Sequence, residues 1–139
     1  MKYVVGLLAT VLAVSLAESE IFTEEQIKGL LVHHKPCLTI PTRDDEFGKR
    51  LANLDVIDDE QLKDYLFCVS KRIGFQNEAG DIRKEVLVEM IRNSKKNTPK
   101  AEEYVDICLA NKNDSPTDTI YKVASCMRSK LWGVPVFQS

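Results

Sequence analysis

The segment IDDEQLKDYLFCVSKRIG, residues 57–74, contains the features that decide the fold. Four of its apolar side chains lie at positions i, i+4, i+7 and i+11, the spacing of one helix face: Leu62, Leu66, Val69 and Ile73. At its start, Asp58 and Gln61 have the spacing of a capping box, and Ile57 and Leu62 flank them as a hydrophobic staple. The segment therefore predicts an amphipathic helix that packs on a core and carries Cys68.

Similar helix starts recur along the chain. Phe22, Thr23, Gln26 and Ile27 repeat the staple and the capping box, with Thr23 as N-cap. Further helices are expected to begin at three pairs of residues: Gly80-Asp81 (through about Asn93), Thr98-Pro99 and Ser115-Pro116. A short helix is also expected over Asp45–Leu51. Apolar stripes follow each start and strand-like alternation is absent, so we predict an all-α protein, a compact bundle of about six helices.

Residues 1–17, MKYVVGLLATVLAVSLA, have the pattern of a secretory signal peptide. A basic residue, Lys2, precedes an apolar run, and Ser15 and Ala17 occupy the small-residue positions of a cleavage site. The run is shorter than the ~20 apolar residues of a membrane span, and no other stretch approaches that length. We expect a secreted protein with no membrane span and one helical domain over residues 18–139.

The four cysteines, Cys37, Cys68, Cys108 and Cys126, suit an oxidising compartment. An even number of cysteines in a secreted chain predicts two disulfides, with three connectivities open to them. His33 and His34 lie near Cys37, but no two cysteines have the short spacing typical of structural zinc sites. We therefore predict neither a bound metal nor another cofactor.

Several other functions have no support in the sequence. The net charge is −2 without a basic face, which does not favour nucleic-acid binding. The nucleophile elbow, the phosphate-binding loop and the zinc-protease motif are absent, and the paired acids fall at helix starts or on polar faces. We predict that the protein is not an enzyme.

The cysteine framework resembles that of the insect odorant-binding proteins, in which six cysteines are usual. Cys37, Cys68, Cys108 and Cys126 fall at the positions of the first, third, fourth and sixth cysteine of that family, and Asp64 and Thr117 stand where the second and fifth would lie. The stretch from Cys68 to Ile82 also resembles the loop that follows the family's third cysteine. The chain is similar to the four-cysteine "minus-C" subgroup.

The resemblance implies the bridges Cys37–Cys68 and Cys108–Cys126 and an internal hydrophobic cavity. We expect a secreted soluble carrier of odorants, pheromones or related lipid-like molecules. A hydrogen bond between Asp64 and Thr117 is expected in place of the missing third bridge.

Family motifs do not name the residues of the cavity, so candidates come from the helical stripes and the C-terminal tail. They are Leu62, Leu66, Val69, Ile73, Phe75, Met90, Ile91, Val105, Val123, Met127, Trp132, Val136 and Phe137. Tyr65 and Tyr121 are the candidate hydroxyls for a polar ligand head. For each of these residues, a place in an ordinary core is the alternative.

A secreted helical signalling protein, cytokine- or hormone-like and acting through its surface, is the second functional hypothesis. The expected partners are a small hydrophobic ligand and a membrane receptor, and the expected state is a monomer or a weak homodimer. The sequence does not distinguish olfaction from transport in another body fluid. His33 and His34 have the side chains suited to a pH switch.

Overall fold

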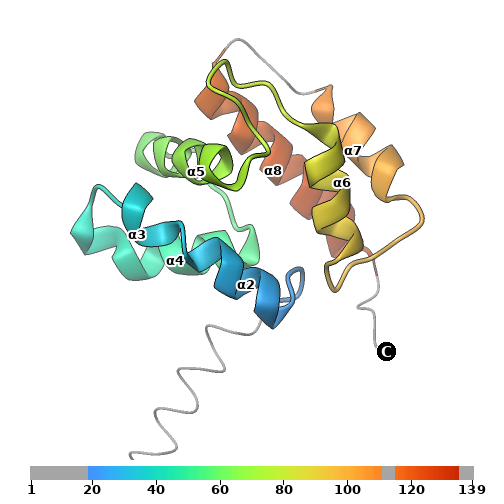
Figure 1. Ribbon diagram of the computed structural model, residues 1–139, viewed down its shortest axis with the longest axis horizontal. Helices are drawn as coiled ribbons and strands as arrows, with labels where there is room; N and C mark the ends of the chain where they lie inside the picture. Colours follow the sequence, from blue (N-terminus) through green and yellow to red (C-terminus); the bar gives the residue numbers. More distant parts are fainter. Residues whose placement is uncertain (1–18, 111–114, 135–139) are drawn as a thin grey trace, which may run out of the picture.

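The computed structural model describes residues 19–110 and 115–134, in which seven α-helices and one 3₁₀ helix account for the regular structure (Figure 1). The elements are α2 (Glu24–Leu31), α3 (His34–Cys37), η1 (Pro41–Arg43), α4 (Asp44–Asn53), α5 (Glu60–Ile73), α6 (Lys84–Arg92), α7 (Ala101–Leu109) and α8 (Pro116–Trp132). Strands are absent from the described residues, which confirms the all-α prediction. The predicted signal peptide lies outside the described residues.

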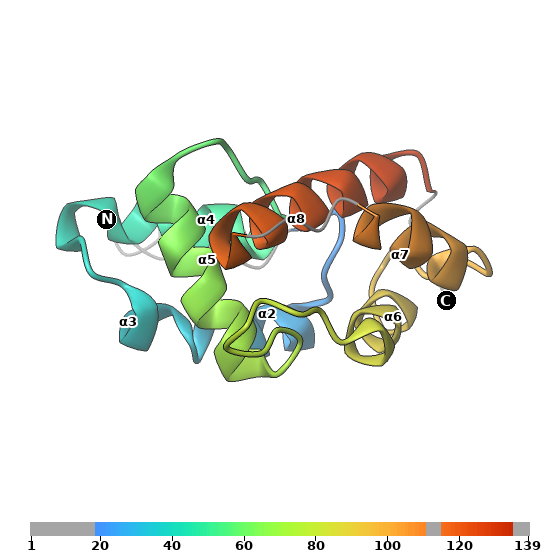
Figure 2. The same ribbon diagram turned by 90° about the horizontal axis from the view of Figure 1, so that it is seen from above.

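Helix α8 occupies the centre of the arrangement, with α5 on one side and α7 on the other (Figures 1 and 2). Helix α6 packs on α7, α2 packs on α4, and α3 packs on α5. The bundle therefore has an α2–α5 part and an α6–α7 part, which α8 joins. The short helix α3 was not among the predicted elements.

Two of the predicted helix starts are confirmed in their details. At α2, the Thr23 hydroxyl accepts a hydrogen bond from the Gln26 amide at 3.1 Å, and the Gln26 side chain accepts one from the Thr23 amide at 3.1 Å. At α8, Ser115 is the N-cap and accepts from the Asp118 amide at 3.3 Å, with Pro116 as the first helical residue. These side chains satisfy amide groups that have no partner inside the helix.

The prediction for the start of α5 was wrong by one residue. The N-cap is Asp59, whose carboxylate accepts from the Leu62 amide at 2.9 Å. Asp58 instead lies 2.5 Å from the ammonium group of Lys63, and Gln61 accepts from Arg43. Two adjacent aspartates offer equivalent caps in the sequence, and tertiary ion pairs decide between them.

Helix α6 begins at Lys84, later than the predicted start at Gly80-Asp81. The preceding residues fold back on themselves, since the Arg83 amide donates to the Phe75 carbonyl at 2.8 Å. Gly80 has φ of +90°, and a Cβ there would lie 2.8 Å from Cβ of Pro116. Gly80 is therefore a turn residue in close contact with α8, not a helix start.

Helix α7 also begins later than predicted, at Ala101. Thr98-Pro99 forms a turn ahead of it, in which the Thr98 carbonyl accepts from the Ala101 amide at 3.1 Å.

Two disulfides tie the helices together. Cys37–Cys68 joins α3 to α5, and Cys108–Cys126 joins α7 to α8. Both pairings are those implied by the family resemblance. Neither bridge joins α5 to α8.

The expected hydrogen bond between Asp64 and Thr117 does not form. The Thr117 hydroxyl lies 3.1 Å from that of Ser115, and Asp64 is exposed. The neighbouring residues make the link instead, because the buried Lys63 of α5 lies 2.8 Å from Asp118 of α8. The ion pair Lys63–Asp118 therefore connects α5 and α8, and each of its residues is the sequence neighbour of a predicted partner.

Candidate binding pocket

A pocket of about 60 Å³ lies among α2, α4, α5, α6 and α8. Its walls are apolar except for two serines. The lining consists of Ile21, Phe22, Leu30, Leu51, Leu54, Leu66, Val69, Ser70, Ile73, Phe75, Leu87, Met90, Ile91, Ser94, Ile120, Val123, Ala124, Met127 and Leu131. Such walls offer an environment for hydrocarbon rather than for charge.

Many of the predicted site residues come together in this pocket. They are Leu66, Val69, Ile73, Phe75, Met90, Ile91, Val123 and Met127. Their agreement with the pocket follows from the helical stripes, because the side of each stripe that faces the other helices also faces the space between them. Their contact with a ligand stays a prediction.

Other predicted site residues lie elsewhere. Leu62 and Val105 are fully buried in the core without lining the pocket. Trp132 is 56% exposed, since it follows the last buried turn of α8, and its ring stacks beneath Arg128. Val136 and Phe137 lie outside the described residues.

The two candidate tyrosine hydroxyls do not line the pocket. The buried Tyr65 points its hydroxyl at Nδ1 of His34, 2.6 Å away, and Nε2 of His34 lies 2.6 Å from Asp44. The ring of Tyr121 lies beneath the Lys63 ammonium, 5.1 Å from its centroid. Burial of the Tyr65 hydroxyl raises its pKa well above the usual range.

Some of the lining residues that the predictions missed have partial signals in the sequence. Leu131 lies four residues after Met127, and Leu87, Ile120 and Ala124 lie among the apolar positions that follow the predicted helix starts at Gly80-Asp81 and Ser115-Pro116. The remaining members are Ile21, Phe22, Leu30, Leu51, Leu54, Ser70 and Ser94. The local pattern gave no signal for Ile21, whose place depends on how the chain folds back before α2.

The segment 19–22 is held against the loop that follows α6. The Lys95 amide donates to the Ile21 carbonyl at 2.9 Å, and the Lys95 ammonium donates to the Ser19 carbonyl at 2.8 Å. The Ser19 hydroxyl accepts from the amides of Ile21 and Phe22. Ile21 and Phe22 are thereby buried and form part of the pocket wall.

The two serine hydroxyls of the pocket already have acceptors. Ser70 Oγ lies 2.5 Å from the side-chain oxygen of Gln76. Ser94 Oγ donates to the Ile91 carbonyl at 2.6 Å and accepts from the Lys96 amide at 3.0 Å. Each hydroxyl has a single proton, so the inner wall presents no unused hydroxyl donor.

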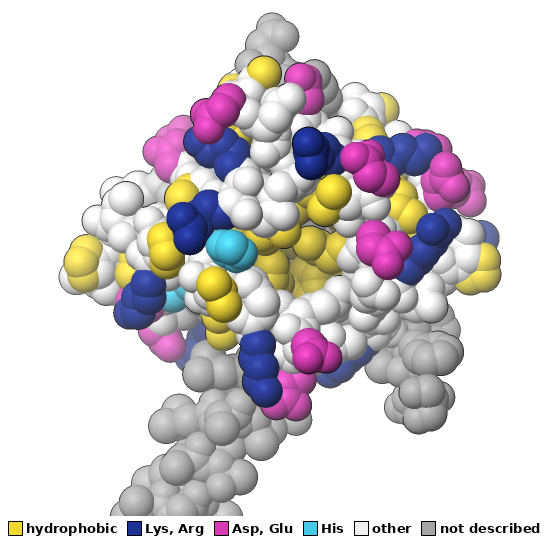
Figure 3. Space-filling view, viewed as in Figure 1, with side chains coloured by type: hydrophobic (Ala, Val, Ile, Leu, Met, Phe, Trp, Pro, Cys, Tyr) yellow, Lys and Arg dark blue, Asp and Glu magenta, His cyan; other side chains and the backbone are white. Residues whose placement is uncertain are grey.

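A groove of about 310 Å³ opens on the surface beside the pocket. It is lined by Phe22, Gln26, Gly29, Leu30, His33, Ile73, Val86 and Met90. The space-filling view shows a hollow with a hydrophobic floor on this face (Figure 3). The groove and the pocket adjoin, because four residues line both: Phe22, Leu30, Ile73 and Met90.

A comparison with known families agrees with the helices and the disulfides. The model of the PBP/GOBP family matches residues 19–130. The chain belongs to this family. The match covers most of the chain and includes every helix from α2 to α7 and most of α8.

Two curated relatives of this odorant-binding family come from Tenebrio molitor. The B1 protein is 28% identical over 105 residues, which cover 76% of this chain and 80% of the relative. The B2 protein is 27% identical over 105 residues, with 76% and 81% covered. No solved structure matches the chain.

Membership in the PBP/GOBP family confirms the predicted resemblance, and two disulfides from four cysteines fit the minus-C subgroup. This is a family of small soluble ligand-binding carriers rather than of enzymes. In the described residues, no helix is long and apolar enough to cross a membrane. No cluster of three metal-binding side chains occurs in the same part of the chain.

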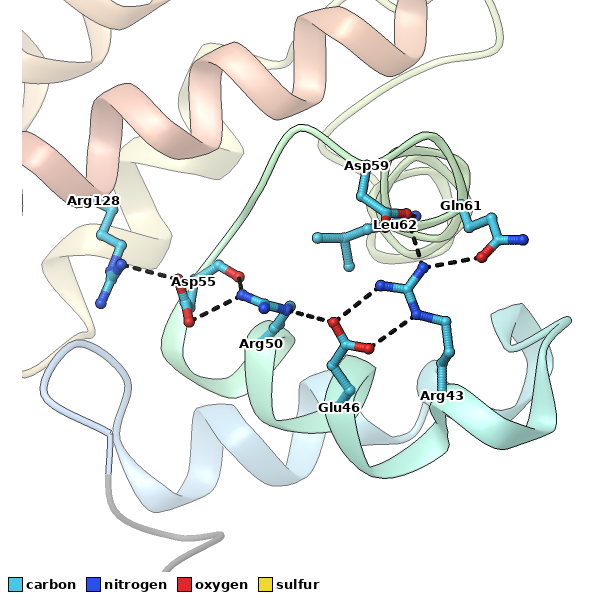
Figure 4. A network of polar contacts seen from close by, with 8 residues as sticks. All are labelled: Arg43, Glu46, Arg50, Asp55, Asp59, Gln61, Leu62 and Arg128. Carbon is cyan, nitrogen blue, oxygen red and sulfur yellow. Dashed lines mark hydrogen bonds and ion pairs between the residues drawn. The ribbon is translucent and has the colours of Figure 1, made fainter.

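A chain of ion pairs fixes α4 in this PBP/GOBP protein (Figure 4). Glu46 accepts from both Arg43 and Arg50 at 2.9–3.0 Å. Asp55 then joins Arg50 to Arg128 of α8, at 3.1 Å from each guanidinium. Hydrogen bonds from Arg43 and then Arg50 lower the pKa of Glu46 to about 2.

Proposed function

We propose that the protein is a secreted carrier that holds a small hydrophobic molecule, such as an odorant, a pheromone or a related lipid-like compound, in the pocket described above. The observation that carries the proposal is the composition of the wall, which is apolar except for Ser70 and Ser94. Family membership supports a carrier role, and the signal-peptide pattern of residues 1–17 supports secretion.

The size of the pocket bears on how it would be filled. Its volume of about 60 Å³ is well below the roughly 300 Å³ at which ligand pockets commonly begin. Met90 and Met127 belong to the wall, and methionine side chains change shape readily because they are unbranched. We expect a ligand to move these side chains and to extend toward the adjoining groove.

The first test is a fluorescence titration of residues 18–139, with both disulfides formed, using the apolar probe N-phenyl-1-naphthylamine. A carrier is expected to bind the probe saturably at one site and to release it to some volatile compounds or fatty acids but not to others. A folded, disulfide-bonded protein that shows no saturable binding would contradict the proposal.

A matched pair of variants locates the probe. Ala124 is buried and lines the pocket, whereas its neighbour Ser125 is exposed on the same helix. Ala124→Leu fills part of the pocket and is expected to weaken probe binding about tenfold, because accommodating both the leucine and the probe overpacks the interior. Ser125→Leu is expected to keep the original affinity. Equal affinities for the two variants would place the probe outside the pocket.

A further inference from the structure

The inner pocket and the surface groove adjoin, and the side chains that they share are apolar. Phe22, Leu30, Ile73 and Met90 line both. The groove opens between α2, the end of α5 and α6, and its floor is the hydrophobic hollow seen in Figure 3. A ligand longer than the inner pocket would therefore meet further apolar surface in the groove once these shared side chains move aside.

The inner part of this space is unsuited to a carboxylate. The hydroxyls of Ser70 and Ser94 donate to protein oxygens, and the other wall residues are apolar. An ionised group that is moved into such surroundings loses its hydration and gains no donor in return, which is very costly. An anionic head would have to stay at the outer end.

The outer end offers the donors that the interior lacks. His33 lines the groove, and the exposed Arg72 of α5 donates from Nε to His33 Nδ1 at 3.2 Å. When the His33 imidazole is neutral and its Nδ1 accepts this hydrogen bond, the ring proton lies on Nε2, which can then act as a donor. The structure contains no ion pair within 4.0 Å between Arg72 and a carboxylate of the described residues. The guanidinium is therefore available to an incoming anion.

The opposite wall of the groove has the other sign of charge. Helix α6 presents Val86 and Met90 to the groove, and the exposed Glu85 and Glu89 are their neighbours in sequence. A negatively charged head is therefore expected on the side of α5 rather than on the side of α6.

We propose that the groove is the outer half of the ligand site, and that it takes the carboxylate of a long-chain aliphatic acid against Arg72 and His33 while the hydrocarbon tail lies in the inner pocket. This rests on the proposed carrier function and assigns a ligand class to it.

The test compares dodecanoate with methyl dodecanoate as competitors of the neutral naphthylamine probe at pH 7. The two molecules share a hydrocarbon tail and differ in the charge of the head. The natural chain is expected to bind dodecanoate about fivefold more tightly than the ester, the scale of an exposed ion pair. Salt at 0.5 M is expected to remove most of that difference, since exposed charges are screened.

Arg72→Gln is expected to abolish the preference for dodecanoate and to leave the affinities for the ester and the probe unchanged. Lys122→Gln is the matched control, because Lys122 is an exposed cation on α8 and its loss changes the net charge equally. A preference that survives Arg72→Gln, or that Lys122→Gln removes as well, would overturn the assignment of the head group. Failure of the neutral probe to bind the natural chain would overturn the carrier function itself.

Discussion

The two sides of the pocket are held in different ways. On the α4–α5 side, the disulfide Cys37–Cys68 joins α3 to α5, and Arg43 pairs both with Glu46 of α4 and with Asp59, the N-cap of α5. On the α6 side, neither disulfide reaches the helix, and a hydrogen bond from the Gln26 side chain to the Met90 carbonyl at 2.8 Å crosses from α2. One wall is therefore fixed by covalent and charged contacts, and the other depends mainly on packing.

This difference indicates which wall would adapt to the proposed ligand. Helix α6 contributes Leu87, Met90 and Ile91 to the pocket, and its polar links to α7 run through the partly exposed Lys84, which pairs with Glu102 and Asp106. Exposed ion pairs contribute little to stability. We expect α6 to move when the pocket enlarges, while α4 and α5 keep their places.

The largest expected effect comes from removing the disulfide of the fixed wall. Replacing Cys37 and Cys68 by serine is expected to lower the free energy of unfolding by about 3–4 kcal/mol, since the bridge closes a loop of 31 residues. The bridge Cys108–Cys126 closes a shorter loop, of 18 residues. Replacing both of its cysteines by serine is therefore expected to lower the free energy of unfolding somewhat less. Urea denaturation measures both. A Cys37–Cys68 variant as stable as the natural chain would show that the wall is not fixed by its bridge.

The next effect concerns the buried hydrogen bonds of the same wall. Tyr65→Phe removes the partner of His34 Nδ1 and is expected to cost about 1–3 kcal/mol, because a buried polar atom is left unpaired. Tyr121→Phe removes the same atom from a half-buried ring and serves as the control. Equal losses of unfolding free energy in the two variants would contradict the role assigned to Tyr65.

Acid is expected to weaken the fixed wall through Glu46. Its pKa falls from 4.5 in the unfolded chain to about 2 in the folded protein, so its contribution is present above about pH 4.5 and is lost as the pH falls toward 2. Thermal unfolding between pH 6 and pH 2 should therefore show a loss of stability that is smaller in Glu46→Gln. Identical pH profiles for the two proteins would exclude this carboxylate as the cause.

The smallest expected effect lies on the adaptable side. Lys95→Met removes the hydrogen bond from the ammonium group to the Ser19 carbonyl and is expected to cost about 0.5–1 kcal/mol. Hydrogen exchange should become faster in the amides of α6 and of residues 19–22, with α5 unchanged. Faster exchange in α5 to the same extent would mean that the two walls open together.

Local signals in the sequence predicted much of the fold. The capping box at Thr23 and the cap at Ser115 define helix starts because their partners lie three residues away. The start at Gly80 was wrong because the close approach of Pro116, 36 positions later, makes that glycine a turn residue. Contacts between distant segments have no trace in a local pattern.

The same limit applies to the pocket. Stripe positions such as Leu66 and Met127 were predictable, because they face the other helices. Leu62 and Val105 occupy equivalent stripe positions and are plain core, since helical spacing gives the face of a helix but not the place of an unfilled volume. The sequence makes Tyr65 a candidate for ligand contact because it does not reveal that His34 lies against the Tyr65 hydroxyl.

The position of Ile21 and Phe22 in the pocket wall has a consequence for how the protein should be produced. The predicted cleavage after Ala17 leaves only three residues ahead of Ile21. A purification tag fused directly to that end would lie close to the pocket wall, and a chain started a few residues too late would remove part of that wall. Expression with the predicted signal peptide, or with a tag at the other terminus, leaves only the natural residues ahead of Ile21.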